Sequence, residues 1–315
     1  MTQTVFIDGA AGTTGLEIAE RLAGRTEFSL ITLDEARRKD AAARAEALND
    51  ADFVILCLPD AAAVEATAMI ANERTRVIDA STAHRVAPDW AYGFPELNAG
   101  QRAAIAAAKR VSNPGCYPTG FLALVAPLVA AGIVARDARL SVNAVSGYSG
   151  GGKELIARFE ADEDIGFRSY GLTLAHKHVP EMRDHAGLIH SPLFAPAVVP
   201  VFRGMLVEVP LAFDRAVADA AFDALAAHFD GSPLISVRRA GDESELLLRK
   251  SDAATDRMEL MLYADPSASQ LRLVARLDNL GKGASGACVQ NLNIMAGMAG
   301  KAGRARLFPP PSRGG

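Results

Sequence analysis

The chain has 315 residues, of which 50% are hydrophobic and 22% are charged, and its formal net charge is −4. Since one hydrophobic core rarely grows beyond about 250–300 residues, the length predicts two domains, and the composition excludes a disordered chain. The weak negative charge, without a long basic run, argues against nucleic acid as a partner.

No stretch of the sequence suits a membrane or export. The N-terminus lacks the basic leader and long apolar stretch of a signal peptide. The longest apolar run in the middle of the chain, residues 121–131, is too short to span a bilayer. Cys57, Cys116 and Cys288 lie far apart in sequence, which excludes a Cys-x-x-Cys site and a paired disulfide framework. These features predict a reduced, cytoplasmic protein without a membrane partner.

The beginning of the chain alternates between strand and helix patterns. Residues 53–58 form an unbroken apolar run, which is typical of a strand covered on both faces of a parallel sheet. Further strands are expected at residues 5–8, 28–33 and 76–79, and helices at residues 16–23 and 61–71. This alternation predicts an α/β fold with a doubly wound, mostly parallel nucleotide-binding sheet.

The pattern changes after Cys116. Longer strand patterns, several of which alternate apolar and polar residues, predict a second α+β domain with a largely antiparallel sheet. The expected strands are residues 140–146, 197–202, 206–211, 258–263 and 271–277, with a helix at residues 214–228 and a last apolar helix at about 284–300.

These patterns divide the chain into two expected domains. The first is a dinucleotide-binding domain at residues 1–115, which the C-terminal helix segment 284–315 is expected to rejoin. The second is a catalytic and dimerisation domain at residues 116–283. The tail at residues 309–315 has the composition of a disordered segment.

A glycine-rich turn follows the first expected strand and opens the first expected helix. Gly9 and Gly12 would let the backbone approach a pyrophosphate, and Gly15 would let helix and strand pack closely, because glycine has no Cβ atom. The start of the helix would offer free N–H groups to the phosphates. The alternative is a glycine turn without a ligand, because the spacing Gly-x-x-Gly-x-x-Gly is only moderately specific. The candidate cofactor-binding residues here are Gly9, Ala11, Gly12, Thr13, Thr14 and Gly15.

The residues after the second expected strand bear on the choice between NAD and NADP. Asp34 lies about where an acid would bind the ribose hydroxyls of NAD. Arg37 and Arg38 follow at once, and their guanidinium groups suit the 2′-phosphate of NADP. We expect NADP as the cofactor, with a solvated charged loop as the alternative for this segment.

The most informative segment is Ser-Asn-Pro-Gly-Cys-Tyr-Pro-Thr, residues 112–119. It places Cys116 in a sharp turn before a helical run, and the N-terminus of a helix lowers the pKa of a thiol. Cys116 is therefore the candidate nucleophile, and Asn113 is expected to help stabilise an oxyanion. A structural thiol is the alternative for Cys116, and it is the expected role of Cys57 and Cys288.

Four of the six histidines cluster within residues 176–190. His176 and His178 precede Pro180, which is typical of the first turn of a helix, so both are expected on the loop that enters it. A thiolate nucleophile needs a partner that handles its proton. We expect His178 to be that acid/base, oriented by Glu181, and His176 to bind the substrate. A metal site is the alternative, but no third ligand is placed nearby, so no metal is expected.

Two further segments have the composition of anion-binding loops. Residues 146–153 combine glycines with Lys153 and suit a phosphate or carboxylate, with a simple hinge as the alternative. Ser81 and Arg85 follow the fourth expected strand, at the sheet edge where ligands of such folds bind, with helix capping as the alternative for Ser81. We assign Ser81 to the cofactor and the substrate contacts to Arg85, Ser146, Gly147, Ser149 and Lys153.

Together these segments resemble the short form of the N-acetyl-γ-glutamyl-phosphate reductases over nearly the whole chain. The resemblance rests on residues 6–18, 112–119, 146–151, 176–181, 200–204 and 278–286. It implies NADPH-dependent reduction of a small acyl phosphate to an aldehyde, with Cys116 as nucleophile and the His-x-His segment as acid/base region. It also implies a cofactor pocket that includes Lys282 and Gly283, a substrate contact from Arg203, and a homo-oligomer, either a dimer or a tetramer.

Three other interpretations stay open. Aspartate-semialdehyde dehydrogenase shares this architecture and a cysteine–histidine pair, but its substrate is smaller. A redox-sensing dinucleotide-binding regulator would not need the cysteine turn and the histidine cluster together. A cysteine-dependent acyl hydrolase would not need the glycine turn with its basic neighbours.

Overall fold

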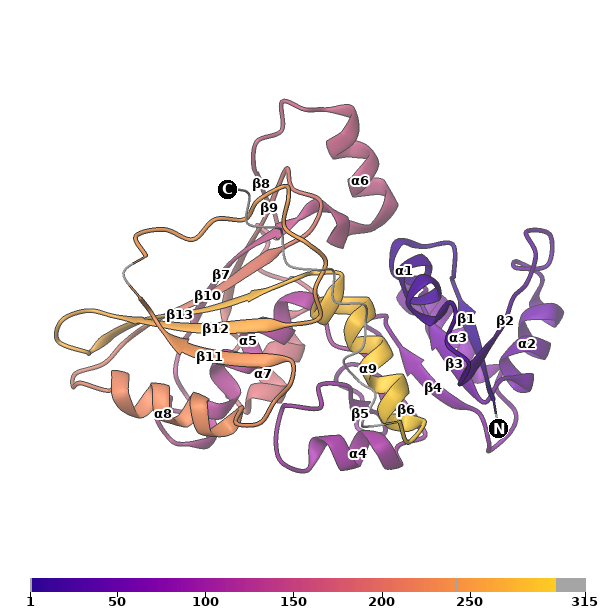
Figure 1. Cartoon of the computed structure of the whole chain (residues 1–315), viewed down its shortest axis with the longest axis horizontal. Coiled ribbons are helices and arrows are strands. Elements are labelled where there is room, and N and C mark those ends of the chain that lie inside the picture. The colour runs from indigo at the N-terminus through magenta and orange to yellow at the C-terminus, as the bar shows by residue number, and fades with distance from the viewer. Residues whose placement is uncertain (1, 242, 299–315) are drawn as a thin grey trace, which may run out of the picture.

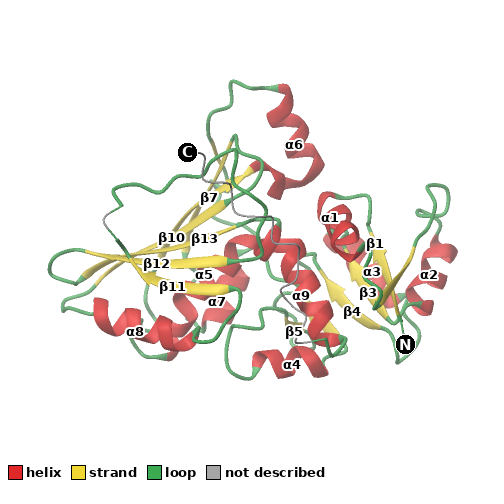
Figure 2. Cartoon of the chain, viewed as in Figure 1, coloured by secondary structure: helices red, strands yellow, loops and turns green. Residues whose placement is uncertain are grey.

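The computed structural model describes residues 2–241 and 243–298 and contains two β-sheets, with helices packed on both (Figures 1 and 2). Sheet A, on the right in Figure 1, is built from the first third of the chain, and sheet B, on the left, is built from the rest. Helix α9 (Gly286–Met295) lies between them. No helix within the described residues is long and apolar enough to cross a membrane.

Sheet A has six strands in the order β2-β1-β3-β4-β6-β5, and all its pairs are parallel. The expected doubly wound parallel sheet is therefore confirmed. Its strands are β1 (Gln3–Asp8), β2 (Phe28–Ile31), β3 (Phe53–Leu56), β4 (Arg76–Asp79), β5 (Ala91–Tyr92) and β6 (Arg110–Ser112). The helices of this part are α1 (Thr13–Leu22), α2 (Ala41–Asp50), α3 (Asp60–Ala68) and α4 (Gln101–Ala107).

Helix α2 has a weak sequence pattern, and the sequence did not predict it. Its buried face consists of two alanines and one leucine, Ala43, Ala47 and Leu48, so it lacks a row of large apolar residues. Its start is nevertheless well defined, because the Asp40 side chain accepts a hydrogen bond from the Ala43 N–H at 2.7 Å. The helix completes the alternation of strands and helices along sheet A.

Sheet B has seven strands in the order β11-β12-β13-β10-β7-β9-β8. The pairs β11–β12 and β7–β9 are parallel and the others are antiparallel, so the expected, largely antiparallel sheet is confirmed. The strands are β7 (Ser141–Gly147), β8 (Arg168–Ser169), β9 (Leu193–Val199), β10 (Met205–Ala212), β11 (Ile235–Arg239), β12 (Met258–Ala264) and β13 (Gln270–Leu277). The helices are α5 (Cys116–Ala130), α6 (Gly152–Ala161), α7 (Val179–Ala186) and α8 (Ala218–His228), with a 3₁₀ turn at Tyr148–Gly151.

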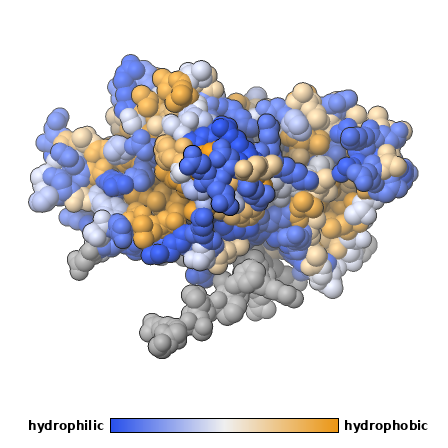
Figure 3. All heavy atoms as spheres, turned by 90° about the horizontal axis from the view of Figure 1, so that it is seen from above, coloured by the Kyte–Doolittle hydropathy of each residue, from blue (hydrophilic) through white to orange (hydrophobic). Residues whose placement is uncertain are grey.

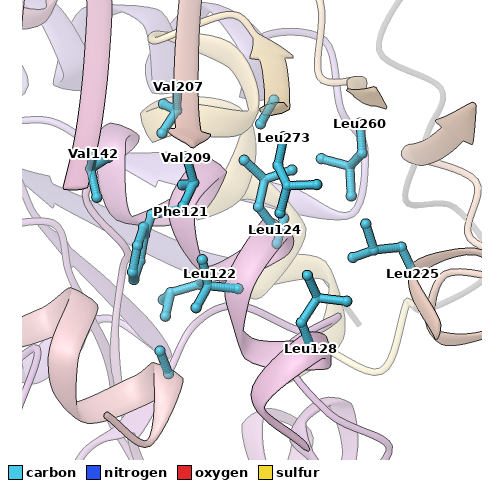
Figure 4. Packing of buried hydrophobic residues seen from close by; sticks show 14 of the residues in the cluster. Phe121, Leu122, Leu124, Leu128, Val142, Val207, Val209, Leu225, Leu260 and Leu273 are labelled. Atoms are coloured by element: carbon cyan, nitrogen blue, oxygen red, sulfur yellow. The ribbon is translucent and has the colours of Figure 1, made fainter. Parts of the chain in front are cut away.

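Helix α5 is the centre of the core beneath sheet B. It is apolar nearly all round, as expected for a helix buried on every side. Phe121, Leu122, Leu124 and Leu128 point from it toward side chains of the sheet and of α8, among them Val207, Val209, Leu225 and Leu273 (Figure 4). Cys116 is the first residue of this helix, so the candidate nucleophile stands on a tightly packed element.

The chain returns to sheet A at its end, as predicted. A π-helical turn (Gly281–Ser285) leads into α9, and Cys288, Leu292 and Ile294 of α9 pack with the core of sheet A. Cys288 is fully buried there, which confirms its structural role. The tail at residues 309–315, like the end of the expected helix beyond residue 298, lies outside the described residues.

Ion pairs connect α1 of sheet A with loops of sheet B. Arg21 Nη1 lies 2.7 Å from Asp256 Oδ1 in the segment before β12. Arg203, which follows β9, lies 2.8 Å from Asp278 and 3.6 Å from Glu17 of α1. These ion pairs hold α1, the helix that follows the glycine turn, against the segments before β12 and after β13.

Candidate active site

The glycine turn has the geometry of a phosphate cradle. Gly9 has a φ of +90°, and a Cβ there would lie 2.3 Å from the backbone oxygen of Cys57, so only glycine fits. A Cβ on Gly15 would lie 2.5 Å from the Gly9 oxygen. Gly12 is the N-cap of α1 and provides no side-chain cap, which leaves the first N–H groups of the helix available to an anion. The turn therefore fits the pyrophosphate of a dinucleotide.

The two arginines expected to bind a 2′-phosphate lie on the surface after β2. Arg37 pairs with Glu46 at 3.0 Å, and Arg38 pairs with Glu35 at 2.6 Å. Exposed pairs of this kind are weak and exchange easily. The Asp34 carboxylate accepts a hydrogen bond from the Arg37 N–H at 2.8 Å, which shapes the loop.

A more buried arginine lies beside the glycine turn and was missed in the sequence. Arg44 of α2 places its Nη2 atom 2.8 Å from Asp8 Oδ2, and Asp8 is the last residue of β1, directly before Gly9. The side chain of Asp8 is only 6% exposed. The sequence signal that could have identified this pair is Asp8 itself, because an acid stands at the end of a buried strand, where an apolar residue is usual.

Cys116 begins α5, and the elements around it converge on the preceding turn. Gly115 is the N-cap of the helix. A Cβ on Gly115 would lie 2.6 Å from both Arg85 Nη1 and His178 Nε2, so the missing side chain makes room for these two groups. Gly283 of the π-helical turn packs on the other side, because a Cβ there would lie 2.8 Å from Cys116 Cβ. Three candidate residues distant in sequence are thus brought next to the nucleophile.

The structure corrects the expected effect of the helix on the thiol. Some of the Cys116 surface remains accessible, but the surrounding protein displaces enough water to raise the pKa of the thiol to about 11. Arg85 and the backbone N–H groups of Tyr117 and Cys116 act in the expected direction and lower this pKa, but they do not outweigh desolvation. At neutral pH Cys116 is therefore largely a thiol, and it could act as a nucleophile only after losing its proton.

Both histidines lie near the nucleophile and are held neutral. Burial lowers the pKa of His176 to about 4 and the pKa of His178 well below its usual value, and the charges of Arg85 and Lys177 act on His178 in the same direction. The rings are in contact, with centroids 4.8 Å apart, and the backbone N–H of His178 donates to His176 Nδ1 at 3.1 Å. Nδ1 of His178 is buried, and no described residue bonds to it.

Glu181 does not orient His178, so this expectation is wrong. Its carboxylate is only 1% exposed and is occupied by other donors. Oε1 accepts hydrogen bonds from the Gly115 N–H at 2.8 Å and from the Tyr92 hydroxyl at 2.6 Å, and Oε2 lies 3.2 Å from Arg85 Nη1. The carboxylate supports the nucleophile turn rather than the imidazole.

The Asn113 side chain also does not make the contact that we expected, because other residues already occupy both its polar atoms. Its Nδ2 donates to the Ala284 oxygen at 3.1 Å, and its Oδ1 accepts from Asn291 Nδ2 at 3.1 Å. It therefore connects the nucleophile turn to the end of the π-helical turn and to α9, and its amide is not free to meet an oxyanion. The uncapped N–H groups at the start of α5 are better placed for that role.

The segment after β4 forms a buried polar cluster. Asp79 accepts hydrogen bonds from the Ser81 N–H at 2.8 Å and the Ser81 hydroxyl at 2.7 Å, and His84 Nδ1 lies 2.6 Å from it. Arg85 Nε donates to the Asn113 oxygen at 2.9 Å, and its Nη2 donates to the Ala80 oxygen at 3.0 Å. The structure thus places Ser81 in a local turn and Arg85 beside Cys116, with its nitrogens bonded to protein acceptors.

The remaining substrate candidates lie at the end of β7 (Ser146 and Gly147), in the 3₁₀ turn (Ser149), in α6 (Lys153) and after β9 (Arg203). The Ser146 hydroxyl donates to the Gly147 oxygen at 3.0 Å, and the Ser149 hydroxyl accepts from Asn279 Nδ2 at 2.9 Å. Both side chains are buried, whereas Lys153 lies exposed on α6. Arg203 is held by Asp278 and Glu17, so it connects the two sheets.

Lys282 is not placed at a cofactor surface. Its side chain is 1% exposed, and its Nζ lies 2.8 Å from Glu96 Oε2 and 2.7 Å from Gln290 Oε1. A buried ammonium needs such partners, and Glu96 and Gln290 occupy it in this structure. Gly283, rather than Lys282, is the residue of this pair that lies beside Cys116.

The described residues hold no group of three or more histidine, cysteine, aspartate or glutamate side chains with the geometry of a metal site. The groups clustered at Gly115 are a thiol, a neutral imidazole and a carboxylate held by three donors. Beside them lies a phosphate cradle at the carboxyl edge of a parallel sheet, the usual ligand-binding position of such folds. This combination suits a cofactor-dependent reaction that passes through a covalent thioester.

Comparison with known proteins agrees with this chemistry. The model of the semialdehyde dehydrogenase NAD binding domain matches residues 34–107, and that of the semialdehyde dehydrogenase dimerisation domain matches residues 116–279. N-acetyl-γ-glutamyl-phosphate reductase from Rhizobium meliloti (strain 1021) is 50% identical over 94% of this chain and 99% of its own. The reductase of that name from Trichormus variabilis (strain ATCC 29413 / PCC 7937) is 48% identical over 93% of this chain and 97% of its own.

Solved structures support the fold alone. Aspartate semialdehyde dehydrogenase II from Vibrio cholerae, in complex with ASA, superposes with a TM-score of 0.72 at 16% identity and covers 94% of this chain and 98% of that chain. A probable aspartate-semialdehyde dehydrogenase from Pseudomonas aeruginosa superposes with a TM-score of 0.69 at 16% identity, with the same coverage of both chains.

Proposed function

The chain belongs to the N-acetyl-γ-glutamyl-phosphate reductases within the semialdehyde dehydrogenase family, and from this membership we propose that Cys116 is the nucleophile of its reaction. The reaction reduces N-acetyl-γ-glutamyl phosphate to the semialdehyde and phosphate with NADPH. The observation that carries the proposal is the convergence of His178, Arg85 and Gly283 on the turn at Gly115 and Cys116.

The first step is removal of the thiol proton. Because the pKa of Cys116 is raised to about 11, little thiolate exists at neutral pH, and a base must accept the proton. His178 is neutral there, because burial lowers its pKa, and its Nε2 faces Gly115. We assign the base to His178.

The thiolate then attacks the carbonyl carbon of the acyl phosphate. A C–S bond forms, the C–O bond to phosphate breaks, and phosphate leaves with the electron pair. The uncapped N–H groups at the start of α5 would stabilise the charge that gathers on the oxygen of the resulting tetrahedral species. The product of this step is a thioester on Cys116.

NADPH, when bound, supplies the hydride that reduces this thioester. The glycine turn and the free N–H groups of α1 would hold its pyrophosphate, and Gly9, Ala11, Gly12, Thr13, Thr14 and Gly15 are the residues assigned to this role. The tetrahedral thiohemiacetal on Cys116 then breaks its C–S bond to release the aldehyde, and His178 returns the proton to the thiolate. His176 and the exposed Lys153 are assigned to the anionic groups of the substrate.

We place the domain boundary at the nucleophile turn, with residues 2–115 and, as far as the structure describes them, residues 284–298 forming one domain and residues 116–283 the other. The continuity of sheet A, the packing of α9 on its core and the placement of α5 under sheet B support this division.

A cytoplasmic location fits a reaction that depends on a free thiol.

We also propose a homo-oligomer, a dimer or a tetramer, assembled through the sheet B domain. The family model that matches this domain describes a dimerisation domain. The surface view shows an apolar patch in its left half, the half that sheet B occupies in Figure 1 (Figure 3). The large exposed apolar side chains of this domain are Phe167, Leu172, Leu174, Ile189, Leu193, Phe202 and Leu247. A monomeric mass in light scattering would contradict this assembly.

The experiment that tests the function follows NADPH absorbance with each candidate aldehyde plus phosphate and NADP. We expect turnover with N-acetylglutamate semialdehyde and little with aspartate semialdehyde. The reverse preference would assign the chain to the aspartate-semialdehyde dehydrogenases, to which its solved neighbours belong at 16% identity.

The choice of NADP can be tested through Arg37 and Arg38. Replacing both by alanine should raise the Kd and KM for NADPH about 10- to 100-fold and barely change those for NADH, since a hydrogen bond to a charged phosphate contributes about 1.5–3 kcal/mol. Fluorescence titration measures Kd, and Arg74→Ala, another exposed arginine paired with an acid, is the control. If both cofactors are affected equally, the arginines do not bind the 2′-phosphate, and Asp34 and Arg44 become the residues to test.

A further inference from the structure

Glu181 is a buried carboxylate that the reaction outlined above does not use. Among the described residues, its three hydrogen-bond donors come from three separate segments. These are the backbone of Gly115 before α5, the Tyr92 hydroxyl of β5 and the Arg85 guanidinium after β4. A buried charge is costly unless such donors satisfy it, so this arrangement is a specific one.

The Gly115 contact connects Glu181 directly to the nucleophile. Gly115 is the N-cap of α5 and Cys116 is the next residue, so a carboxylate that binds the Gly115 N–H fixes the peptide between Pro114 and Gly115, directly before the one that leads into Cys116. Arg85 closes the same arrangement from the other side, because its Nε binds the oxygen of Asn113, two residues earlier. The turn is thus held through one N–H and one C=O group.

We propose that Glu181 is a positioning residue that acts through the Gly115 N–H and through Arg85 to fix the direction in which the Cys116 sulfur faces the acyl carbon. The proposal rests on Cys116 being the nucleophile, as proposed above. Placement of this kind matters because a displacement of about 1 Å can lower turnover about 100-fold.

The negative charge of Glu181 destabilises the Cys116 thiolate. A positioning role and an electrostatic role therefore predict opposite effects when this charge is removed. The charged or titratable groups that face Cys116 are Arg85 from the loop after β4, His178 at the N-cap of α7, Glu181 from α7, Tyr117 from α5 and Tyr170 after β8. Among them Arg85 lowers the pKa of the thiol and Glu181 raises it. If Glu181 acted only by its charge, neutralising it would make the enzyme faster.

The test combines Glu181→Gln with Glu181→Asp. Glutamine removes the charge, and its amide N–H₂ group cannot accept a hydrogen bond from Arg85. We therefore expect Cys116 to react with iodoacetamide at lower pH than in the parent protein, whereas kcat falls about 10- to 100-fold. Aspartate keeps the charge but is too short to reach the Gly115 N–H, so its alkylation profile should stay close to that of the parent while kcat falls similarly. KM for the acyl phosphate should change less than kcat in both variants.

Cys116→Ser provides the blank for alkylation, because Cys57 and Cys288 also have a raised pKa. Asp184→Asn, at a half-exposed position of the same helix, is the matched control and should leave both readouts unchanged. A kcat within twofold of the parent in a folded Glu181→Gln or Glu181→Asp protein overturns the positioning role. A raised kcat in the folded Glu181→Gln protein overturns it too, because the carboxylate would then act only through its charge. Alkylation does not need turnover, so failure of the premise that Cys116 is the nucleophile would be seen separately, as activity retained by Cys116→Ser.

Discussion

Replacing Cys116 by serine is expected to lower kcat at least 1,000-fold while NADPH binding and folding remain intact. A hydroxyl is a much weaker nucleophile than a thiol at neutral pH, and no other side chain can form the thioester. Serine is smaller and polar, but the first turn of α5 leaves part of the Cys116 surface accessible, so little packing is lost. The packed remainder of the helix should hold its position.

Turnover is measured by NADPH absorbance, cofactor binding by fluorescence titration and folding by thermal denaturation. Cys288→Ala is the control, since it removes another thiol in the core of sheet A, far from the nucleophile turn in the sequence. Retention of more than about a tenth of the parent kcat in the folded serine variant would rule out covalent catalysis by this residue.

The fold was largely predictable because its strands have strong local patterns. Residues 53–58 and 76–79 could only be buried strands, and the glycine turn fixed where the first helix begins. Elements with weak local patterns were missed, such as α2 with its alanine face and the two-residue strand β5. The strand expected at residues 197–202 corresponds to β9, which spans Leu193–Val199. The expected start came too late because Pro196 interrupts the strand pattern in the sequence.

The sequence indicated which residues belong to the candidate site better than it indicated which contacts they make. Cys116 and His178 could be identified because their segments have chemistry that a core does not need. The partner of Glu181 could not be identified, because proximity in sequence to His178 suggested a contact that the first turn of α7 does not make. Its real partners, Tyr92 and Arg85, lie 89 and 96 residues away, and only the folded sheet A brings them there. Lys282 was expected in the cofactor pocket, and its pairing with Glu96, which is 186 residues away, could not be anticipated for the same reason.

His178→Ala is expected to lower kcat about 100- to 10,000-fold, the usual contribution of a general base. The pH profile should identify the cause. In the parent enzyme, activity falls when acid protonates His178, and because burial lowers the pKa of this residue well below 6.5, that limb should lie below pH 6.5. Without the base, attack depends on spontaneous ionisation of Cys116, whose pKa is about 11. The rate of the variant should therefore rise about tenfold per pH unit across the neutral range.

His176→Ala provides the comparison, because the two rings are in contact and only one can take the proton from Cys116. Its backbone-bonded Nδ1 holds the loop that presents His178, and its exposed edge is assigned to the substrate, so the variant should chiefly raise KM for the acyl phosphate. It should also keep the acid limb of the parent, since His178 remains. The reverse pattern, with the limb lost in His176→Ala and kept in His178→Ala, would exchange the two roles.

If both histidine variants kept full activity, the Cys116 thiol with its raised pKa would need another base. The other titratable groups that face it among the described residues are Arg85, Glu181, Tyr117 and Tyr170, and none of them is suited to accept its proton. Arg85 is cationic, and the Glu181 carboxylate is already held by three donors. Burial raises the pKa of both tyrosines, which keeps their hydroxyls protonated at neutral pH. Full activity of both variants would therefore contradict the covalent route through Cys116 itself, and not only the choice of its base.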